Sequence, residues 1–167
     1  MGKLRIIKGS ISYKELIPLY DVIINPTNPK MRLIDGISNI IFKRVTIKRL
    51  NAYINKKYHI INNPNNYMQE GNIRITPGFN IGPDIMFIRI PINDKENSLE
   101  QLISFYRNIL NSININDYKD VLIPDLALEK YGYTYKSIKR YIHSLIKDFI
   151  KDKDINIDVV YNKTYFD

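Results

Sequence analysis

Short apolar runs without polar alternation are the feature that most constrains how this chain folds. The clearest runs are residues 21–24, 85–90, 121–123 and 157–161. A strand with one exposed face alternates apolar and polar residues, whereas a strand covered on both faces is apolar almost throughout. Between the runs, apolar residues recur at helical spacing, as in residues 99–113 and 135–149. This alternation predicts an α/β protein with three α/β/α layers around a mixed central sheet.

Weaker patterns complete the predicted order of elements. Residues 4–7 and 73–76 predict two more strands, and the apolar spacing from Ile37 to Leu50 predicts one helix. The chain has 167 residues, of which 44% are hydrophobic and 25% charged, so we expect one domain over residues 1–167.

Several classes of protein are disfavoured by what the sequence lacks. No apolar stretch approaches the ~18 residues of a membrane helix, and the N-terminus does not resemble a signal peptide. We therefore expect a soluble, cytoplasmic protein with no membrane partner. The absence of cysteine excludes disulfides and thiolate metal sites. We expect no metal and no cofactor.

The net charge of +8 favours anionic partners such as nucleotides or nucleic acid. However, isoleucine, asparagine, lysine and tyrosine are all abundant, as AT-rich codon usage alone would produce, and the basic residues form no long block. Charge by itself is therefore weak support for direct nucleic-acid binding.

Two segments that follow predicted strands are candidates for chemistry, because sheets of this kind bind ligands beyond their carboxyl ends. In residues 25–35, Asn25 and Asn28 flank a turn, where their amides either stabilise the turn or contact sugar hydroxyls. Gly36 precedes a helix; it forms a plain turn or lets an anion approach the helix N-terminus. In residues 124–133, Tyr131 and Tyr133 either pack in the core on both sides of a turn at Gly132 or form an aromatic wall against a base or ribose.

Residues along most of the chain resemble the macro domain family. Residues 21–37, with NPTN and then Gly36-Ile37, resemble the family's N-A-A-N strand end and glycine-rich loop. GNIRITPG at residues 71–78 and FYRNIL at residues 105–110 are similar to two further family motifs. Residues 123–133 resemble the second loop, F-P-x-I-S-T-G-V-Y-G-Y. The motifs occur in family order.

The resemblance implies a mostly parallel sheet and a cleft for ADP-ribose, either free or attached to protein or nucleic acid. By carry-over, Asn28 would contact the distal ribose, and Gly36 and Ile37 would offer N–H groups to the diphosphate. The candidate ligand-binding residues are Ser10, Ile11, Asn25, Asn28, Gly36, Ile37, Ser38, Leu126, Ala127, Leu128, Glu129, Lys130, Tyr131, Gly132 and Tyr133.

Departures from the family pattern predict weaker affinity or a shifted ligand. Ser10 replaces the aspartate that binds the adenine amino group, and a neutral hydrogen bond is weaker than a charge-assisted one. Glu129 replaces a loop glycine, so its carboxylate would repel a diphosphate unless Lys130 or the turn directs it outward.

The candidate catalytic residues are Asn28 and Asp35. Asn28 can orient a substrate but cannot accept a proton, and Asp35 is either a base or the N-cap of the following helix. A missing general base costs about 10²–10⁴-fold in rate, so we expect slow or absent ADP-ribosyl hydrolase activity. The alternative function is a catalytically inactive, macro-like interaction module that binds protein or nucleic acid.

Overall fold

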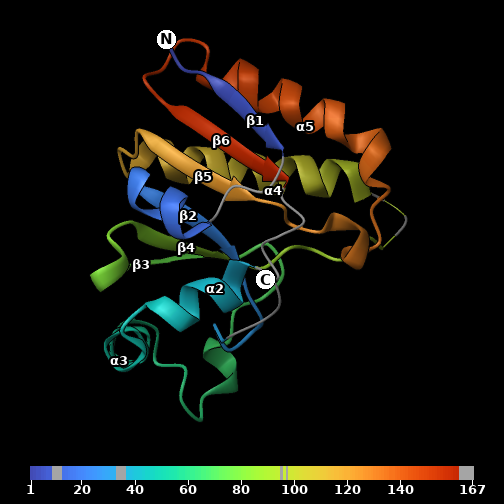
Figure 1. The fold of residues 1–167 in the computed structure, drawn as a ribbon. Helices are drawn as coiled ribbons and strands as arrows, with labels where there is room; N and C mark the ends of the chain where they lie inside the picture. Colours follow the sequence, from blue (N-terminus) through green and yellow to red (C-terminus); the bar gives the residue numbers. More distant parts are fainter. Residues whose placement is uncertain (9–12, 33–36, 95, 97, 162–167) are drawn as a thin grey trace.

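The computed structural model describes residues 1–8, 13–32, 37–94, 96 and 98–161. A six-stranded sheet has the order β1-β6-β5-β2-β4-β3 (Figure 1). The strands are β1 (Leu4–Lys8), β2 (Val22–Pro26), β3 (Ile73–Thr76), β4 (Asp84–Ile88), β5 (Asp120–Pro124) and β6 (Asn156–Tyr161). Neighbouring strands are parallel except for β3, which is antiparallel to β4. The prediction of a mixed, mostly parallel sheet is confirmed.

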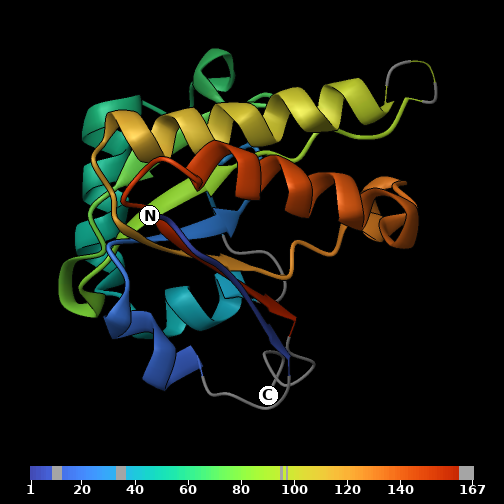
Figure 2. The ribbon, with the colours of Figure 1, turned by 90° about the horizontal axis from the view of Figure 1, so that it is seen from above.

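Helices cover both faces of the sheet (Figures 1 and 2). One face packs against α4 (Ser98–Ile115) and α5 (Tyr135–Ile150). The other packs against α2 (Ile37–Arg44), α3 (Ile47–Tyr58) and the short N-terminal pair α1 (Tyr13–Leu16) and η1 (Ile17–Leu19). The three predicted layers are therefore present. Among the described helices, none combines the length and apolar character needed to cross a membrane.

Burial on both faces explains why the strands lack alternation. In β2, Val22 and Ile24 enter the core beneath α4 and α5, whereas Ile23 enters the core beneath α2 and α3. All three side chains have no exposed surface. Because successive strand residues point to opposite faces, both sets must be apolar when both faces are covered.

The prediction of one helix from Ile37 to Leu50 is wrong, because the chain breaks between α2 and α3. Thr46 is extended, with φ −68° and ψ 91°. The Asn80 side chain fills the break: its Oδ1 accepts the Thr46 N–H at 2.6 Å, and its Nδ2 donates to the Arg44 carbonyl at 2.6 Å. A residue distant in sequence thus takes over the hydrogen bonds that a continuous helix would have made.

The run at residues 85–90 also ends earlier than predicted. Strand β4 stops at Ile88, and the next residue, Arg89, bonds instead to the loop before β3. Its N–H donates to the Asn72 carbonyl at 3.1 Å, and its carbonyl accepts the Gly71 N–H at 2.7 Å.

Candidate functional site

The sheet divides at the carboxyl ends of β2 and β5. Strand β2 is in register with β4 from Val22 to Pro26, but with β5 only at Val22 and Ile23. The chain leaving β2 leads to β3 and β4 on one side, whereas the chain leaving β5 leads to β6 on the other. Such a switch point is where open α/β sheets bind ligands. We call this region the carboxyl edge, comprising residues 25–32, the start of α2 and residues 124–134.

Asn25 is the most unusual residue at the carboxyl edge. Its side chain has no exposed surface, yet neither Oδ1 nor Nδ2 has a hydrogen-bond partner among the described residues. An amide buried without hydrogen bonds costs about 1–3 kcal/mol in proteins, so native structures rarely contain one. An unpaired buried amide beside a strand switch point is suited to meeting a polar ligand.

Asn28 organises the turn that follows β2. Its Oδ1 accepts the backbone N–H groups of Lys30 and Arg32, each at 3.0 Å. The turn-stabilising role considered from the sequence is therefore present. Among the described residues, no acceptor contacts Nδ2, so the Asn28 side chain keeps donor capacity for a ligand while its oxygen is occupied.

Helix α2 begins at Ile37, and its first-turn N–H groups include those of Ile37 and Ser38. The helix start follows the β2 turn closely in the chain, as the sequence predicted. Four candidate residues lie outside the described part of the structure: Ser10, Ile11, Asp35 and Gly36.

Buried side chains dominate the segment after β5. Leu126 and Leu128 are 5% and 2% exposed, so both residues belong to the core. Ala127 between them has φ 50°, which is unusual for a residue other than glycine. The carboxylate of Asp125 stabilises this turn, because its Oδ1 accepts the Ala127 N–H at 3.0 Å.

The same segment is hydrogen-bonded to the loop that follows β4. Tyr133 is buried, and its hydroxyl donates to the Pro91 carbonyl at 2.7 Å. The side-chain nitrogen of Asn93 donates to the Gly132 carbonyl at 2.7 Å, and its backbone N–H donates to the Tyr131 carbonyl at 2.9 Å. The Tyr133 ring thus belongs to the core, and its backbone N–H donates to the Leu128 carbonyl at 3.3 Å.

The remaining candidates of this loop are accessible. Glu129 and Lys130 are exposed on the turn η4 (Leu128–Tyr131), and Tyr131 is half-buried. Water therefore surrounds the Glu129 carboxylate, which weakens its repulsion of a nearby anion.

The sequence analysis did not predict a cluster of three polar side chains near the ends of β5 and β6. Asp125, His143 and Tyr161 line a small cavity of about 10 Å³, roughly the space for one water molecule. His143 Nε2 lies 3.2 Å from the Tyr161 hydroxyl. Burial, assisted by nearby lysines, lowers the pKa of the His143 imidazole. No spacing in the sequence indicates this group, because its members come from separate elements.

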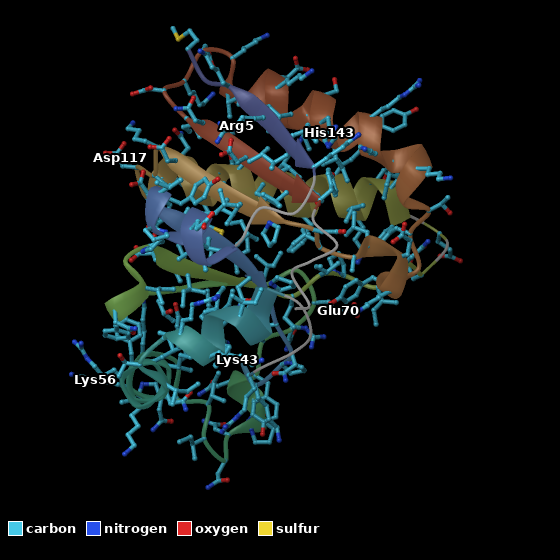
Figure 3. All side chains as sticks on the ribbon, in the orientation of Figure 1. Arg5, Lys43, Lys56, Glu70, Asp117 and His143 are labelled. Atoms are coloured by element: carbon cyan, nitrogen blue, oxygen red, sulfur yellow. The ribbon has the colours of Figure 1, made fainter. Side chains whose placement is uncertain are left out.

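In Figure 3, His143 lies on the side of the molecule toward which β5 and β6 point.

The part of the chain that the structure describes contains no cluster of three or more His, Asp or Glu side chains that could hold a metal ion. The polar groups at the carboxyl edge include the Asn25 and Asn28 amides and the first N–H groups of α2, which suit the hydroxyls and phosphates of a nucleotide-like ligand.

The three layers, the mostly parallel sheet and the switch point between β2 and β5 define an α/β/α sandwich whose ligands are expected at the carboxyl ends of the strands. The sequence model of the macro domain family matches residues 24–142, and this chain belongs to the macro domain family. No curated protein sequence matches the chain significantly.

Solved macrodomain structures share the fold at low sequence identity. The Oceanobacillus iheyensis macrodomain with MES bound is 20% identical, with a TM-score of 0.74, over 95% of this chain and 83% of that one. The same protein with ADP is 19% identical, with a TM-score of 0.67, over 87% and 78%. The Trypanosoma brucei macrodomain in complex with ADP-ribose is 16% identical, with a TM-score of 0.69, over 98% and 66%.

Proposed function

We propose that this chain binds ADP-ribose, or a closely related ADP-ribosyl derivative, at the carboxyl edge. Membership of the macro domain family supports this ligand class, as do the similar structures that contain ADP or ADP-ribose. The observation that carries the proposal is the buried Asn25 amide, which has no partner among the described residues. Nothing in the described fold satisfies it, and because its side chain has no exposed surface, a ribose hydroxyl would reach it only after a shift of the residues that cover it.

The backbone and side-chain donors suggest how the ligand is held. Asn28 would donate through Nδ2 to a hydroxyl of the distal ribose, since its Oδ1 is occupied by the turn. The first N–H groups of α2, on Ile37 and Ser38, would receive the diphosphate, because helix N-termini favour anions. Glu129 in η4 would weaken binding only modestly, because its side chain is exposed.

Slow or absent hydrolysis is the finer part of the proposal. Cleavage of an ADP-ribosyl bond needs a water molecule activated by a base. Residues 25–32 contain no carboxylate, and an amide such as that of Asn28 does not accept a proton. On the second loop, Asp125 accepts the Ala127 N–H and Glu129 is exposed. Asp35 we assign as the N-cap of α2 rather than as a base. We therefore expect release of ADP-ribose from modified protein or DNA to be about 10²–10⁴-fold slower than in an active hydrolase of the family. Comparable turnover would contradict this expectation.

Calorimetry with Asn28→Asp tests the binding site. The aspartate keeps an oxygen for the Lys30 and Arg32 N–H groups but loses the donor proposed to face the ribose. We expect saturable binding of ADP-ribose by the native protein and at least ~10-fold weaker binding by the variant, equivalent to about 1.4 kcal/mol. Affinity for ADP, which lacks the distal ribose, should fall less.

Asn108→Asp is the matched control, because Asn108 is exposed on α4 and the charge change is the same. Its affinity for ADP-ribose should stay within about twofold of the native value. Absence of heat with the native protein would reject the proposed ligand and favour the interaction-module alternative. Equal losses in the two variants would reject the assigned role of Asn28.

A further inference from the structure

Positive charge is concentrated on the two helices that follow β2. Residues 36–69 contain no aspartate or glutamate but hold Lys43, Arg44, Lys48, Arg49, Lys56 and Lys57. All six side chains are exposed. Figure 3 shows Lys43 on α2 and Lys56 on α3, with Lys56 at the side of the molecule away from His143. This stretch therefore contributes +6 of the protein's net charge of +8.

Cations and aromatic rings alternate along α3. Arg49, Tyr53 and Lys57 are four residues apart, so they share one face of the helix. The Arg49 guanidinium lies 4.5 Å from the centre of the Phe79 ring, and Lys57 Nζ lies 5.7 Å from that of Tyr53. Phe79 and Tyr53 meet edge to face at 6.2 Å, which joins the two pairs.

The alternation continues from α3 onto strand β3. Lys57 Nζ is also 5.3 Å from the centre of the Tyr58 ring, and the Arg74 guanidinium lies 4.8 Å from the same ring. The Tyr58 hydroxyl holds that ring in place, since it accepts the Ile75 N–H at 3.1 Å and donates to the Ile75 carbonyl at 2.9 Å. We call Arg49, Tyr53, Lys57, Tyr58, Arg74 and Phe79 the cation–aromatic ladder.

The charges of the ladder are not neutralised. Within the part of the chain that the structure describes, no carboxylate forms an ion pair with Arg49, Lys57 or Arg74. Four ladder residues line an open groove of about 430 Å³, whose lining also includes Ser112, Asn116, Asp84 and Tyr118. The Asp84 carboxylate accepts the Tyr118 hydroxyl at 2.7 Å. Three cations thus face solvent or aromatic rings rather than acids.

Most of the groove lies at the end of the parallel strands opposite the carboxyl edge, although Arg74 in its lining reaches toward that edge, with Nη1 3.8 Å from the Met31 sulfur. The lining of the groove includes Asp84, which begins β4, and Thr76, which ends the antiparallel strand β3. Asn25 lies instead near the end of β2, opposite Phe87 of β4. A ligand in the groove would therefore not compete for space with a ligand at the carboxyl edge.

We propose that the cation–aromatic ladder binds single-stranded nucleic acid. Proteins that bind single strands combine a positive groove for the phosphates with aromatic and guanidinium surfaces on which bases stack. From Arg49 to Lys57 the helix rises about 12 Å, which spreads the charges over more than one phosphate. This spacing fits a chain of nucleotides better than a single nucleotide. The aromatic rings favour nucleic acid over an acidic protein, because bases stack on rings and acidic side chains do not.

Fluorescence anisotropy with a labelled single-stranded RNA of about 12 nucleotides, at about 50 mM salt, tests the proposal. The double variant Arg49→Gln with Lys57→Gln should bind at least ~10-fold more weakly. Its slope of log affinity against log salt should shrink by about 1.4, because two phosphate contacts are lost. The control is Lys147→Gln on α5 with Lys151→Gln directly after it, which removes the same charge from exposed sites outside the groove. The control should bind within about twofold of native.

A second pair of variants separates base stacking from charge. Tyr53→Leu should weaken binding about fivefold or more, whereas Tyr53→Phe keeps the ring and should stay within about twofold. Thermal unfolding checks that both variants are folded. Unchanged affinity in Tyr53→Leu would overturn the proposal, because it would leave only an electrostatic patch.

Three other results would also overturn it: no binding by the native protein, an equal loss in the α5 control, or equal affinity for a duplex of the same length. Saturating ADP-ribose should not displace the RNA. Displacement would place the RNA at the carboxyl edge and reject the ladder as its site. Because the ladder does not depend on the proposed ADP-ribose site, failure of either proposal leaves the other standing.

Discussion

Replacing Asn25 with leucine should make the protein more stable and remove its ligand binding. The side chain is fully buried in β2, and no described residue satisfies its amide. Leucine has the same branching and the same number of heavy atoms, but it has no polar group to desolvate. A residue retained at the expense of stability is expected where a ligand needs it.

The magnitude follows from the desolvation of an unpaired amide. Removing that penalty should raise the free energy of unfolding by about 1–3 kcal/mol. For a domain of this size, each kcal/mol shifts the melting temperature by roughly 2–4 °C, so we expect an increase of about 2–12 °C. The assays are thermal and urea unfolding, together with calorimetric titration of ADP-ribose, whose affinity should fall at least ~10-fold.

Thr76→Val is the matched control with the opposite sign. Thr76 is also fully buried, but its hydroxyl donates to the Pro77 carbonyl at 3.1 Å. Its replacement should therefore lower the free energy of unfolding by about 0.5–1.5 kcal/mol. Destabilisation of Asn25→Leu would refute the reasoning, because the amide would then be satisfied in the folded state. Stabilisation with unchanged ADP-ribose affinity would refute the ligand contact.

Three further changes address the second loop and the neighbouring histidine. Gly132→Ala should lower the free energy of unfolding by about 1–2 kcal/mol in urea titrations, because φ is +88° and a Cβ would lie 3.2 Å from that of Asn93. Tyr133→Phe should cost about 1–3 kcal/mol by the same measurement, since the Pro91 carbonyl loses its partner, and an unchanged midpoint would contradict that. Burial lowers the pKa of His143, so the unfolded state binds the proton more readily. Stability should therefore fall as pH drops below about 6.5, and less so in His143→Gln, when urea midpoints at about pH 7.5 and 5.5 are compared.

The layers of this protein could be predicted from the sequence because their cause is local. A strand covered on both faces is apolar at successive positions, as Val22, Ile23 and Ile24 show, and a helix on a sheet repeats every three to four residues. The two strand-end segments were also visible, since prolines and glycines interrupt the apolar runs there. These features need no knowledge of which strands become neighbours.

The tertiary structure decided what those segments contact. Strand order places β2 beside β5 and lets them part after Ile23, which no local pattern encodes. The break between α2 and α3 depends on Asn80, a residue far along the chain that binds Thr46.

The same reason applies to both candidate sites. Asn25 could be recognised as a turn or ligand residue, but its unpaired amide is a property of everything packed around it. The spacing of Arg49, Tyr53 and Lys57 is local to one helix, whereas Phe79 and Arg74 join them only through the fold. Periodicity records which face of an element is buried, and only long-range packing determines which partner covers it or leaves it open.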